Sequence, residues 1–472
     1  MSAELDRAAA TCLFPGFAGT AASDWIRRWA ERGLGGVVLF ARNIEAPDQV
    51  ASLTRALRRE RGDLLVAIDE EGGDVTRLEA RTGSSYPGNW ALGVVDDPEL
   101  TEAVAASIAS ELASVGINFD FAPVADVNSN PDNPVIGIRA FGSEPSLVAR
   151  HVAAFVTGLQ RQGVAACAKH FPGHGDTSHD SHLELPIVHG DVAAALEPFQ
   201  AAIGAGVRSI MTAHVLVPGL SPEQATMSPE ILGDLLREEL GFTGVVVTDA
   251  LEMRAVSATV GVEPASIRAL AAGADAICLG AETDDPLVTR VHEAIVAAVH
   301  SGQLAEERLH DAASRVHELA DWGRTPDTGA VRRELGAEAA TRALRVEGDV
   351  RFRRQPFVVE LRPPVSIAAG DPLHGLAEPL EAGEAVQLGE GEPLPDPAGR
   401  PVAIVVRDAH RHEWQRAAVE RLLATAPEAV VVEVGLPLWR PTGSAWVATH
   451  GGGRANLEAA AAVLSPVPAQ TR

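Results

Sequence analysis

Short runs of apolar, often β-branched residues recur along the first two thirds of the chain, and longer amphipathic stretches separate them. Apolar runs of this length are typical of buried parallel strands, and the intervening stretches have helical periodicity. Eight strands that alternate with helices predict a (β/α)8 barrel of the TIM type rather than an open sheet. The expected strands are residues 10–17, 36–40, 64–68, 117–124, 164–168, 209–213, 245–248 and 275–279.

Polar residues follow five of these apolar runs. Active sites of barrel enzymes lie at the carboxyl-terminal ends of the strands, so residues at these points are candidates for chemistry. The residues are Asp69 after LLVAI, Asp126 and Asn128 after FAPV, Lys169 and His170 after VAACA, His214 after IMTA, and Asp249 after VVVT.

The composition changes after an expected helix at residues 306–319. Residues 321–329 (DWGRTPDTG) are rich in turn formers and predict a linker. Another helix is expected at 334–344, with strand-like runs at 357–361, 402–406 and 429–434. We therefore expect a catalytic barrel over residues 1–325, a linker and helix over 326–350, and a small C-terminal α/β domain over 351–472, whose role the sequence does not indicate.

The C-terminal domain has one local motif, GGGR at residues 451–454, ahead of an expected helix. N–H groups at the start of a helix can hold an anion. Glycine runs of this kind most often form only a turn, and the spacing is not a dinucleotide fingerprint.

Charge and composition narrow the classes of partner. The chain has 472 residues with a hydrophobic fraction of 46%, enough for two large cores. Its 64 acidic and 39 basic residues give a net charge of −25. Such a charge argues against nucleic acid or an anionic membrane as a partner.

The N-terminus and the cysteines indicate a cytoplasmic protein. Glu4 and Asp6 stand where a secretory signal carries positive charge, and no uncharged apolar stretch is long enough to span a membrane. The three cysteines, Cys12, Cys167 and Cys278, are odd in number and lie in apolar contexts. We expect them to be reduced core residues.

Residues 164–186 (VAACAKHFPGHGDTSHDSHLELP) concentrate titratable side chains that a core could not bury without partners. In this segment Asp180 lies two residues before His182, where its carboxylate can orient the imidazole ring and raise its pKa. Asp249 ends a strand on a rigid element. Glycoside hydrolysis needs a proton donor for the leaving oxygen and a carboxylate that stabilises or captures the oxocarbenium-like centre, and His182 and Asp249 suit these two roles.

Eight ordered segments within residues 10–325 closely resemble the bacterial family 3 glycoside hydrolases that cleave β-N-acetylglucosamine, the NagZ-type β-N-acetylhexosaminidases. The segments are GGVVLF, IDEEGG, FAPVADVN, NPVIGIRAFG, KHFPGHG, DSH, MTAHVLVPG and VTDALEM. The resemblance implies a retaining exo-β-N-acetylglucosaminidase that needs no cofactor or metal and acts on cell-wall (peptidoglycan) fragments through a covalent glycosyl-enzyme.

The resemblance also implies a role for each matching residue. Asp249 would be the nucleophile, His182 the proton donor and acceptor, and Asp180 its partner. The expected substrate ligands are Asp69, Arg77, Arg139, Lys169 and His170. Asp74 departs from the pattern, because the family often has arginine there, and the loss of that charge puts recognition of acidic peptide-bearing substrates in doubt.

Several alternatives stay open at this point. A β-N-acetylglucosaminide phosphorylase or a broader β-glucosidase would share the family, although family β-glucosidases take their acid–base carboxylate from a second domain. A metal-dependent hydrolase would use a cluster drawn from His170, His174, Asp176, His179, Asp180 and His182, but the spacing is poor for this purpose. A non-catalytic sugar-binding protein would not require both an Asp–His pair and a strand-end carboxylate.

Overall fold

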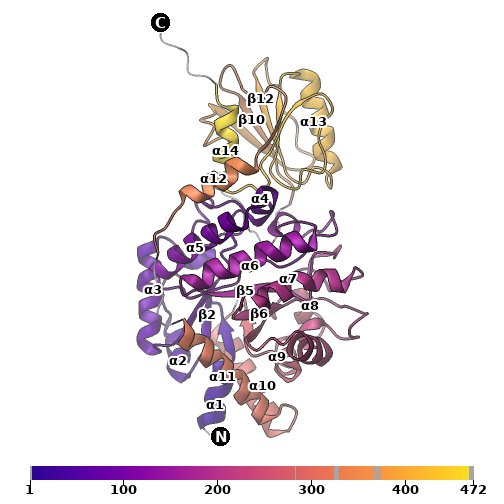
Figure 1. The fold of residues 1–472 in the computed structure, drawn as a ribbon. Helices are drawn as coiled ribbons and strands as arrows, with labels where there is room; N and C mark the ends of the chain where they lie inside the picture. Colours follow the sequence, from indigo (N-terminus) through magenta and orange to yellow (C-terminus); the bar gives the residue numbers. More distant parts are fainter. Residues whose placement is uncertain are drawn as a thin grey trace. The chain divides into compact units, whose positions relative to one another are not determined.

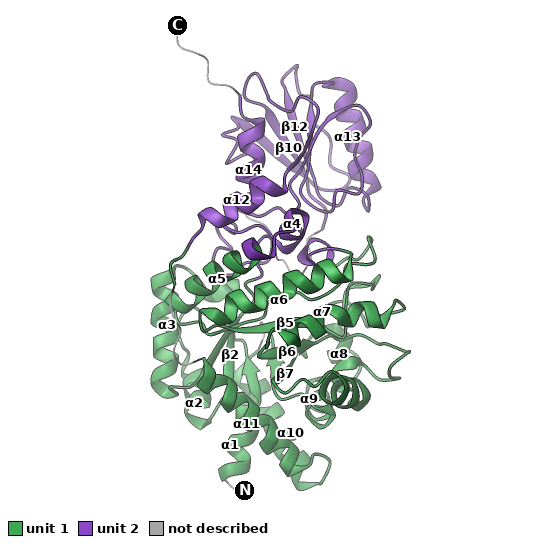
Figure 2. Ribbon diagram, in the orientation of Figure 1, with its two compact units in different colours: residues 1–70, 101–136, 143–331 green, residues 71–100, 137–142, 332–472 purple. Residues whose placement is uncertain are grey.

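The computed structural model describes residues 3–281, 283–323, 329–364, 367, 370 and 374–466. The chain forms two compact units, which Figure 2 shows in different colours. Unit 1 contains residues 1–70, 101–136 and 143–331, and unit 2 contains residues 71–100, 137–142 and 332–472. The expected domain boundaries stay a prediction, and residues 324–328 of the expected linker lie outside the described residues.

Unit 1 contains eight parallel strands, as expected for the barrel. Ladders join β2 through β7 in chain order, an isolated bridge joins Val247 of β7 to Ala276 directly before β8, and β8 pairs with β1. Ahead of the starts of β1 and β2, the Gly35 N–H donates a hydrogen bond to the Ala10 carbonyl oxygen. The strands are β1 (Leu13–Pro15), β2 (Gly36–Leu39), β3 (Leu65–Ile68), β4 (Phe119–Asp120), β5 (Ala165–Phe171), β6 (Ser209–Thr212), β7 (Val245–Thr248) and β8 (Ile277–Leu279).

Most strand boundaries agree with the expectation to within two residues, and three boundaries differ by more. Ala10 and Thr11 belong to helix α1 (Ala3–Thr11), because the preceding alanines favour a helix. Strand β4 ends at Asp120, before Pro123, which lacks the N–H that a ladder requires. The expectation that Lys169 and His170 follow their strand is wrong, since β5 continues to Phe171 and both residues lie inside it.

Helices follow most of the barrel strands and cover the outside of the barrel (Figure 1). Asp191 and Asp284 accept backbone hydrogen bonds at the starts of α7 and α10, as helix-capping residues do. The other bounds are α2 (Asp24–Arg32), η1 (Ala41–Asn43), α3 (Pro47–Glu60), α5 (Pro98–Ser114), α6 (Pro145–Arg161), α7 (Val192–Gly204), η3 (Ala225–Met227), η4 (Glu230–Glu239, a π-helix), α8 (Arg254–Ser257), α9 (Val262–Ala272), α10 (Asp285–His300) and α11 (Glu306–Trp322).

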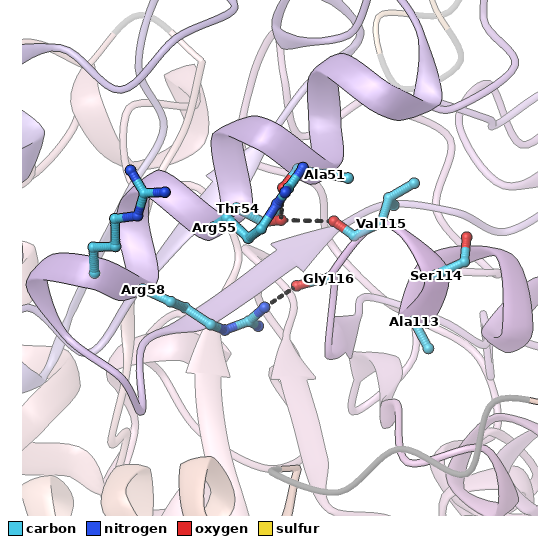
Figure 3. Close-up of a pocket in the computed structure, with 9 residues that line it drawn as sticks. Ala51, Thr54, Arg55, Arg58, Ala113, Ser114, Val115 and Gly116 are labelled. Atoms are coloured by element: carbon cyan, nitrogen blue, oxygen red, sulfur yellow. Dashed lines mark hydrogen bonds between the residues drawn. The ribbon is translucent and has the colours of Figure 1, made fainter.

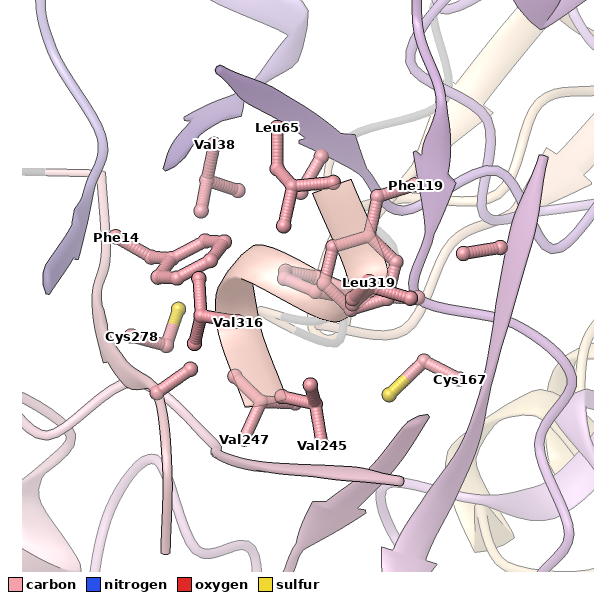
Figure 4. Close-up of a cluster of buried hydrophobic side chains, with 14 of the residues drawn as sticks. Phe14, Val38, Leu65, Phe119, Cys167, Val245, Val247, Cys278, Val316 and Leu319 are labelled. Atoms are coloured by element: carbon pink, nitrogen blue, oxygen red, sulfur yellow. The ribbon is translucent and has the colours of Figure 1, made fainter. Parts of the chain in front are cut away.

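The barrel interior is filled by side chains from successive strands (Figure 4). Phe14, Leu65 and Phe119 are fully buried in it, and α11 contributes Val316 and Leu319 to the same cluster. A packed interior leaves no channel, so chemistry is confined to the loops at the strand ends.

Unit 2 is built on a six-stranded sheet in the order β11-β10-β12-β13-β14-β9, in which only β9 is antiparallel to its neighbour. Alternate strand residues face opposite sides, so Val359 packs in one cluster with Val419 of α13, and Val358 in another with Leu457 of α14. The elements are α4 (Asn89–Val95), η2 (Gly137–Arg139), α12 (Glu334–Ala343), β9 (Arg345–Glu347), β10 (Phe357–Leu361), β11 (Glu384–Leu388), β12 (Val402–Val406), α13 (Glu413–Thr425), β13 (Val430–Glu433), β14 (Ala445–Ala448) and α14 (Arg454–Leu464).

The expected fold, a barrel followed by an α/β domain, is confirmed. The expected helices at 306–319 and 334–344 and all three C-terminal strands are present. Strands β9, β11 and β14 were not expected. Of these, the edge strands β9 and β11 are largely exposed and lack a continuous apolar run.

The three cysteines are unpaired and buried, as expected. Within the described part of the chain, no helix combines the length and the apolar character needed to cross a membrane.

Candidate active site

Asp249 stands directly after β7, at the carboxyl-terminal end of the barrel strands. Its Oδ1 accepts a hydrogen bond from the Ala250 N–H at 2.8 Å. Burial alone would raise the pKa of Asp249, but the nearby rings of His170, His214 and His182 outweigh burial, and the pKa lies below its usual value. The carboxylate is therefore ionised at neutral pH, which is the state a nucleophile requires.

Asp180 and His182 form the expected hydrogen-bonded pair in the loop after β5. The ring Nδ1 of His182 donates to Asp180 Oδ1 at 2.7 Å, and the His182 backbone N–H donates to the same oxygen at 2.9 Å. Burial opposes ionisation of Asp180, yet the contacts with His182 prevail and lower the pKa of Asp180. The imidazole is thus oriented by an ionised carboxylate.

His174 supports the loop that carries this pair. Its Nδ1 lies 2.7 Å from Thr177 Oγ1 and its Nε2 lies 3.0 Å from Ser181 Oγ. Burial lowers the pKa of His174 to about 4, so the ring is neutral at physiological pH. Next to it, a Cβ on Gly175 would lie 1.8 Å from the Val127 carbonyl oxygen, so only glycine fits there. Packing and hydrogen bonds together fix this part of the loop.

Lys169 and His170 each pair with a carboxylate. Lys169 Nζ donates to Asp69 Oδ1 at 2.7 Å, and the Lys169 side chain is only 2% exposed. His170 Nδ1 donates to the fully buried Asp126 Oδ2 at 2.7 Å. Burial by itself raises the pKa of Asp126, but the charge of His170 lowers it below its usual value. These pairs allow two polar residues to lie inside a buried strand.

Two further residues near Asp249 were given no role on the basis of the sequence. His214 is buried, with Nδ1 2.8 Å from Thr226 Oγ1 and Nε2 3.1 Å from the Ala250 carbonyl oxygen. Glu252 has a pKa raised by burial and, to a smaller extent, by the charge of Asp249. His214 was one of the strand-end candidates, because it follows an apolar run, whereas nothing local in the sequence distinguishes Glu252.

The two expected sugar-binding arginines belong to unit 2. Arg139 forms a two-point ion pair with Glu71, with Nη2–Oε1 and Nε–Oε2 distances of 2.8 and 3.0 Å. Arg77 lies in the segment between β3 and α4. Asp74 accepts a hydrogen bond from the Gly452 N–H at 2.8 Å and another from Arg407. Asp74 is therefore paired with Arg407, which also belongs to unit 2.

The structure gives the residues of the alternative metal cluster separate contacts. A ring nitrogen of His170 is hydrogen-bonded to Asp126, and a ring nitrogen of His182 to Asp180. His174 has both ring nitrogens in hydrogen bonds, one with Thr177 and one with Ser181. His179 is 59% exposed at its side chain. Among the described residues, no group of three or more His, Cys, Asp or Glu side chains is arranged to hold a metal ion.

A cavity of about 370 Å³ lies elsewhere on unit 1, between α3 and the end of α5 (Figure 3). Thr54 and Arg58 donate there to the carbonyl oxygens of Val115 and Gly116, just beyond the end of α5. Because α5 precedes β4, this cavity is at the amino-terminal ends of the strands, away from Asp249.

Residues 19–319 match the model of the glycosyl hydrolase family 3 N terminal domain. The chain therefore belongs to glycoside hydrolase family 3, as the sequence resemblance implied.

Related proteins agree with this assignment. A beta-hexosaminidase A of Pseudoalteromonas piscicida is 36% identical over 343 residues, which is 66% of this chain and 56% of that protein. A beta-hexosaminidase of Stenotrophomonas maltophilia (strain K279a) is 40% identical over 56% of this chain and 82% of its own length. The solved structure of a glycoside hydrolase family 3 beta-N-acetylglucosaminidase from Paenibacillus sp. str. FPU-7 has a TM-score of 0.86 at 35% identity, covering 98% of this chain and 96% of that chain.

Proposed function

We propose that this protein is a retaining exo-β-N-acetylglucosaminidase. The observation that carries the proposal is the Asp180–His182 hydrogen bond of 2.7 Å, in the same unit as the ionised carboxylate of Asp249. An oriented imidazole and a strand-end carboxylate are the acid–base group and the nucleophile that a two-step glycoside hydrolysis needs. The similarity to proteins named beta-hexosaminidase and beta-N-acetylglucosaminidase supports the same sugar.

In the first step, an Asp249 carboxylate oxygen bonds to the anomeric carbon, and the bond from that carbon to the leaving oxygen breaks. His182 gives its Nε2 proton to the leaving oxygen while Nδ1 keeps its hydrogen bond to Asp180. The imidazolium becomes a neutral imidazole. The product is a covalent glycosyl-enzyme and the free aglycone.

In the second step, neutral His182 accepts a proton from water at Nε2. The water oxygen bonds to the anomeric carbon and the bond to Asp249 breaks, which restores the carboxylate and the imidazolium. Two displacements at the same carbon retain the β configuration. Asp180 stays ionised throughout and stabilises the charged ring, in agreement with the lowered pKa of its carboxyl group.

Asp69, Arg77, Arg139, Lys169 and His170 are the proposed substrate ligands. Lys169 is held by Asp69, and His170 by Asp126, so both side chains have a fixed direction before substrate arrives. Preorganised donors of this kind bind sugar hydroxyls with little loss of conformational entropy.

The proposed substrates are cell-wall (peptidoglycan) fragments that carry terminal β-linked N-acetylglucosamine, and the proposed compartment is the cytoplasm. Both proposals follow from the family resemblance. The net charge of −25 fits a neutral or weakly charged carbohydrate better than a polyanion.

A panel of aryl β-glycosides tests the proposal. We expect the N-acetylglucosaminide to be cleaved with the highest kcat/KM and the first-formed sugar to be the β-anomer by proton NMR. A preference for the glucoside would favour the β-glucosidase alternative, and an α-anomer as the first product would exclude the covalent mechanism.

A further inference from the structure

The segment of residues 71–88, which we call the Arg77 loop, follows barrel strand β3 but belongs to unit 2 (Figure 2). We propose that the C-terminal sheet of unit 2 positions this loop, and through it Arg77, for the sugar. This inference rests on the proposed function, since Arg77 is assigned there as a substrate ligand. It gives the C-terminal region a role in substrate binding.

The first anchor of the loop is Asp74. Its side chain is 10% exposed and accepts hydrogen bonds from the Arg407 guanidinium and from the backbone N–H of Gly452, the latter at 2.8 Å. Burial lowers the pKa of Arg407, but the attraction of Asp74 outweighs it, and the net pKa is raised. Arg407 follows β12 and Gly452 precedes α14, so a single carboxylate connects the loop to two elements of the sheet domain.

The second anchor is Glu79. Its Oε1 accepts a hydrogen bond from Arg454 at 2.9 Å, and its two carboxylate oxygens also hold Ser85 through the hydroxyl and the backbone N–H at 2.7 and 2.6 Å. Arg454 donates further to the Gly83 carbonyl oxygen at 3.2 Å. Ala455 N–H, in the first turn of α14, donates to the Ser84 carbonyl oxygen at 3.1 Å. The loop therefore accepts hydrogen bonds from the first two residues of α14, Arg454 and Ala455.

Backbone packing adds to these bonds. Gly73 has φ +61°, and a Cβ there would lie 2.4 Å from the Gly88 Cα. A Cβ on Gly453 would lie 3.1 Å from the Gly73 Cα. A side chain at Gly73 would collide with Gly88 within the loop, and a side chain at Gly453 would press on the loop at Gly73.

Arg77 lies three residues after Asp74 and two residues before Glu79, between the two anchors. A ligand side chain on a loop needs such support, because a displacement of about 1 Å can cost roughly 100-fold in rate. The acidic residue that departs from the family pattern at position 74 thus acquires a function: it joins the loop to Arg407.

The test compares Arg407→Gln with Arg407→Lys, and uses Arg440→Gln as a matched control. Arg440 pairs with Glu347 on the same domain, and both residues are exposed. Hydrogen exchange of peptides within 71–88 reports loop order, and KM and kcat on an aryl N-acetylglucosaminide report positioning. For Arg407→Gln we expect faster exchange in the loop and a KM raised about tenfold with kcat within about threefold of wild type. Arg407→Lys should partly restore the slow exchange of the loop and the low KM.

The control variant should match the wild type in all three measurements. Unchanged exchange in Arg407→Gln would overturn the anchoring, and faster exchange with an unchanged KM would overturn the positioning of Arg77. If Arg407→Gln fails to fold, Asp74→Asn, which keeps the side-chain shape, must show the same pattern. If the wild type cleaves no N-acetylglucosaminide, the proposed function fails together with the role of Arg77, while the exchange data still decide whether the loop is anchored.

Discussion

Asp180 Oδ1 accepts two hydrogen bonds from His182, one from ring Nδ1 at 2.7 Å and one from the backbone N–H at 2.9 Å. The two bonds fix the ring relative to its own backbone and direct Nε2 away from the carboxylate. A histidine held in this way has one nitrogen for orientation and one for proton transfer.

If the pair works as a unit, removal of either member should have a similar effect. We expect Asp180→Ala and His182→Ala to slow substrates with poor leaving groups far more than activated aryl glycosides, because an activated leaving group needs little protonation. The double variant should be little worse than the worse single variant. Rate constants for the three variants on two leaving groups check this, and simple additivity would contradict it.

Asp249→Asn should fold normally and lose several orders of magnitude in kcat, because an amide is a poor nucleophile. The thermal unfolding midpoint serves as the control for folding. A variant with near wild-type kcat would require another nucleophile.

Acid should destabilise the fold in part through His174. Its pKa is about 4 in the folded protein and 6.5 as the ordinary value, so the unfolded chain takes up the proton first as the pH falls. The stability that the neutral ring contributes is complete above 6.5 and is lost as the pH falls from 6.5 towards 4, by roughly 2 kcal/mol near pH 5.

The variant His174→Gln tests this assignment. It should be less stable at neutral pH, but its unfolding midpoint should fall less steeply with acid. His179→Gln, at an exposed position, is the matched control and should keep the wild-type slope. Parallel curves for wild type and His174→Gln would contradict the assignment.

Activity should survive prolonged chelation, since no proposed step uses a cation. The rate is measured before and after dialysis against a chelator. A loss that only added metal restores would favour the metal-dependent alternative.

Hydrolysis should predominate over phosphorolysis, with glycosyl phosphate as a minor product at millimolar phosphate. A neutral histidine base repels an anionic acceptor less than a glutamate would, so some phosphate transfer is expected. Quantifying sugar 1-phosphate against free sugar decides between them, and a predominance of the phosphate would make the enzyme a phosphorylase with the same residue roles.

The sequence alone predicted the barrel and the position of Asp249, because both depend on local patterns: apolar runs and the residue that ends a run. The sequence pattern misplaced the end of β5, because an expected buried strand is ended at the first charged residue. Lys169 continues the strand because it is stabilised by Asp69, 100 positions away. The contact between Asp74 and Arg407 spans 333 positions and leaves no local signal. The pattern of apolar and polar residues could not predict which distant residue pairs with a given charged side chain.

Residues 71–100 and 137–142 are encoded in the barrel half of the gene, yet they pack with residues 332–472. Helix α4 contacts α12, and Asp74 contacts Arg407. A recombination event that exchanged everything after residue 331 would leave these internal segments without the partners they evolved with. The barrel and the sheet of this gene are therefore expected to be inherited together, and a chimera would need to carry all three segments from one parent.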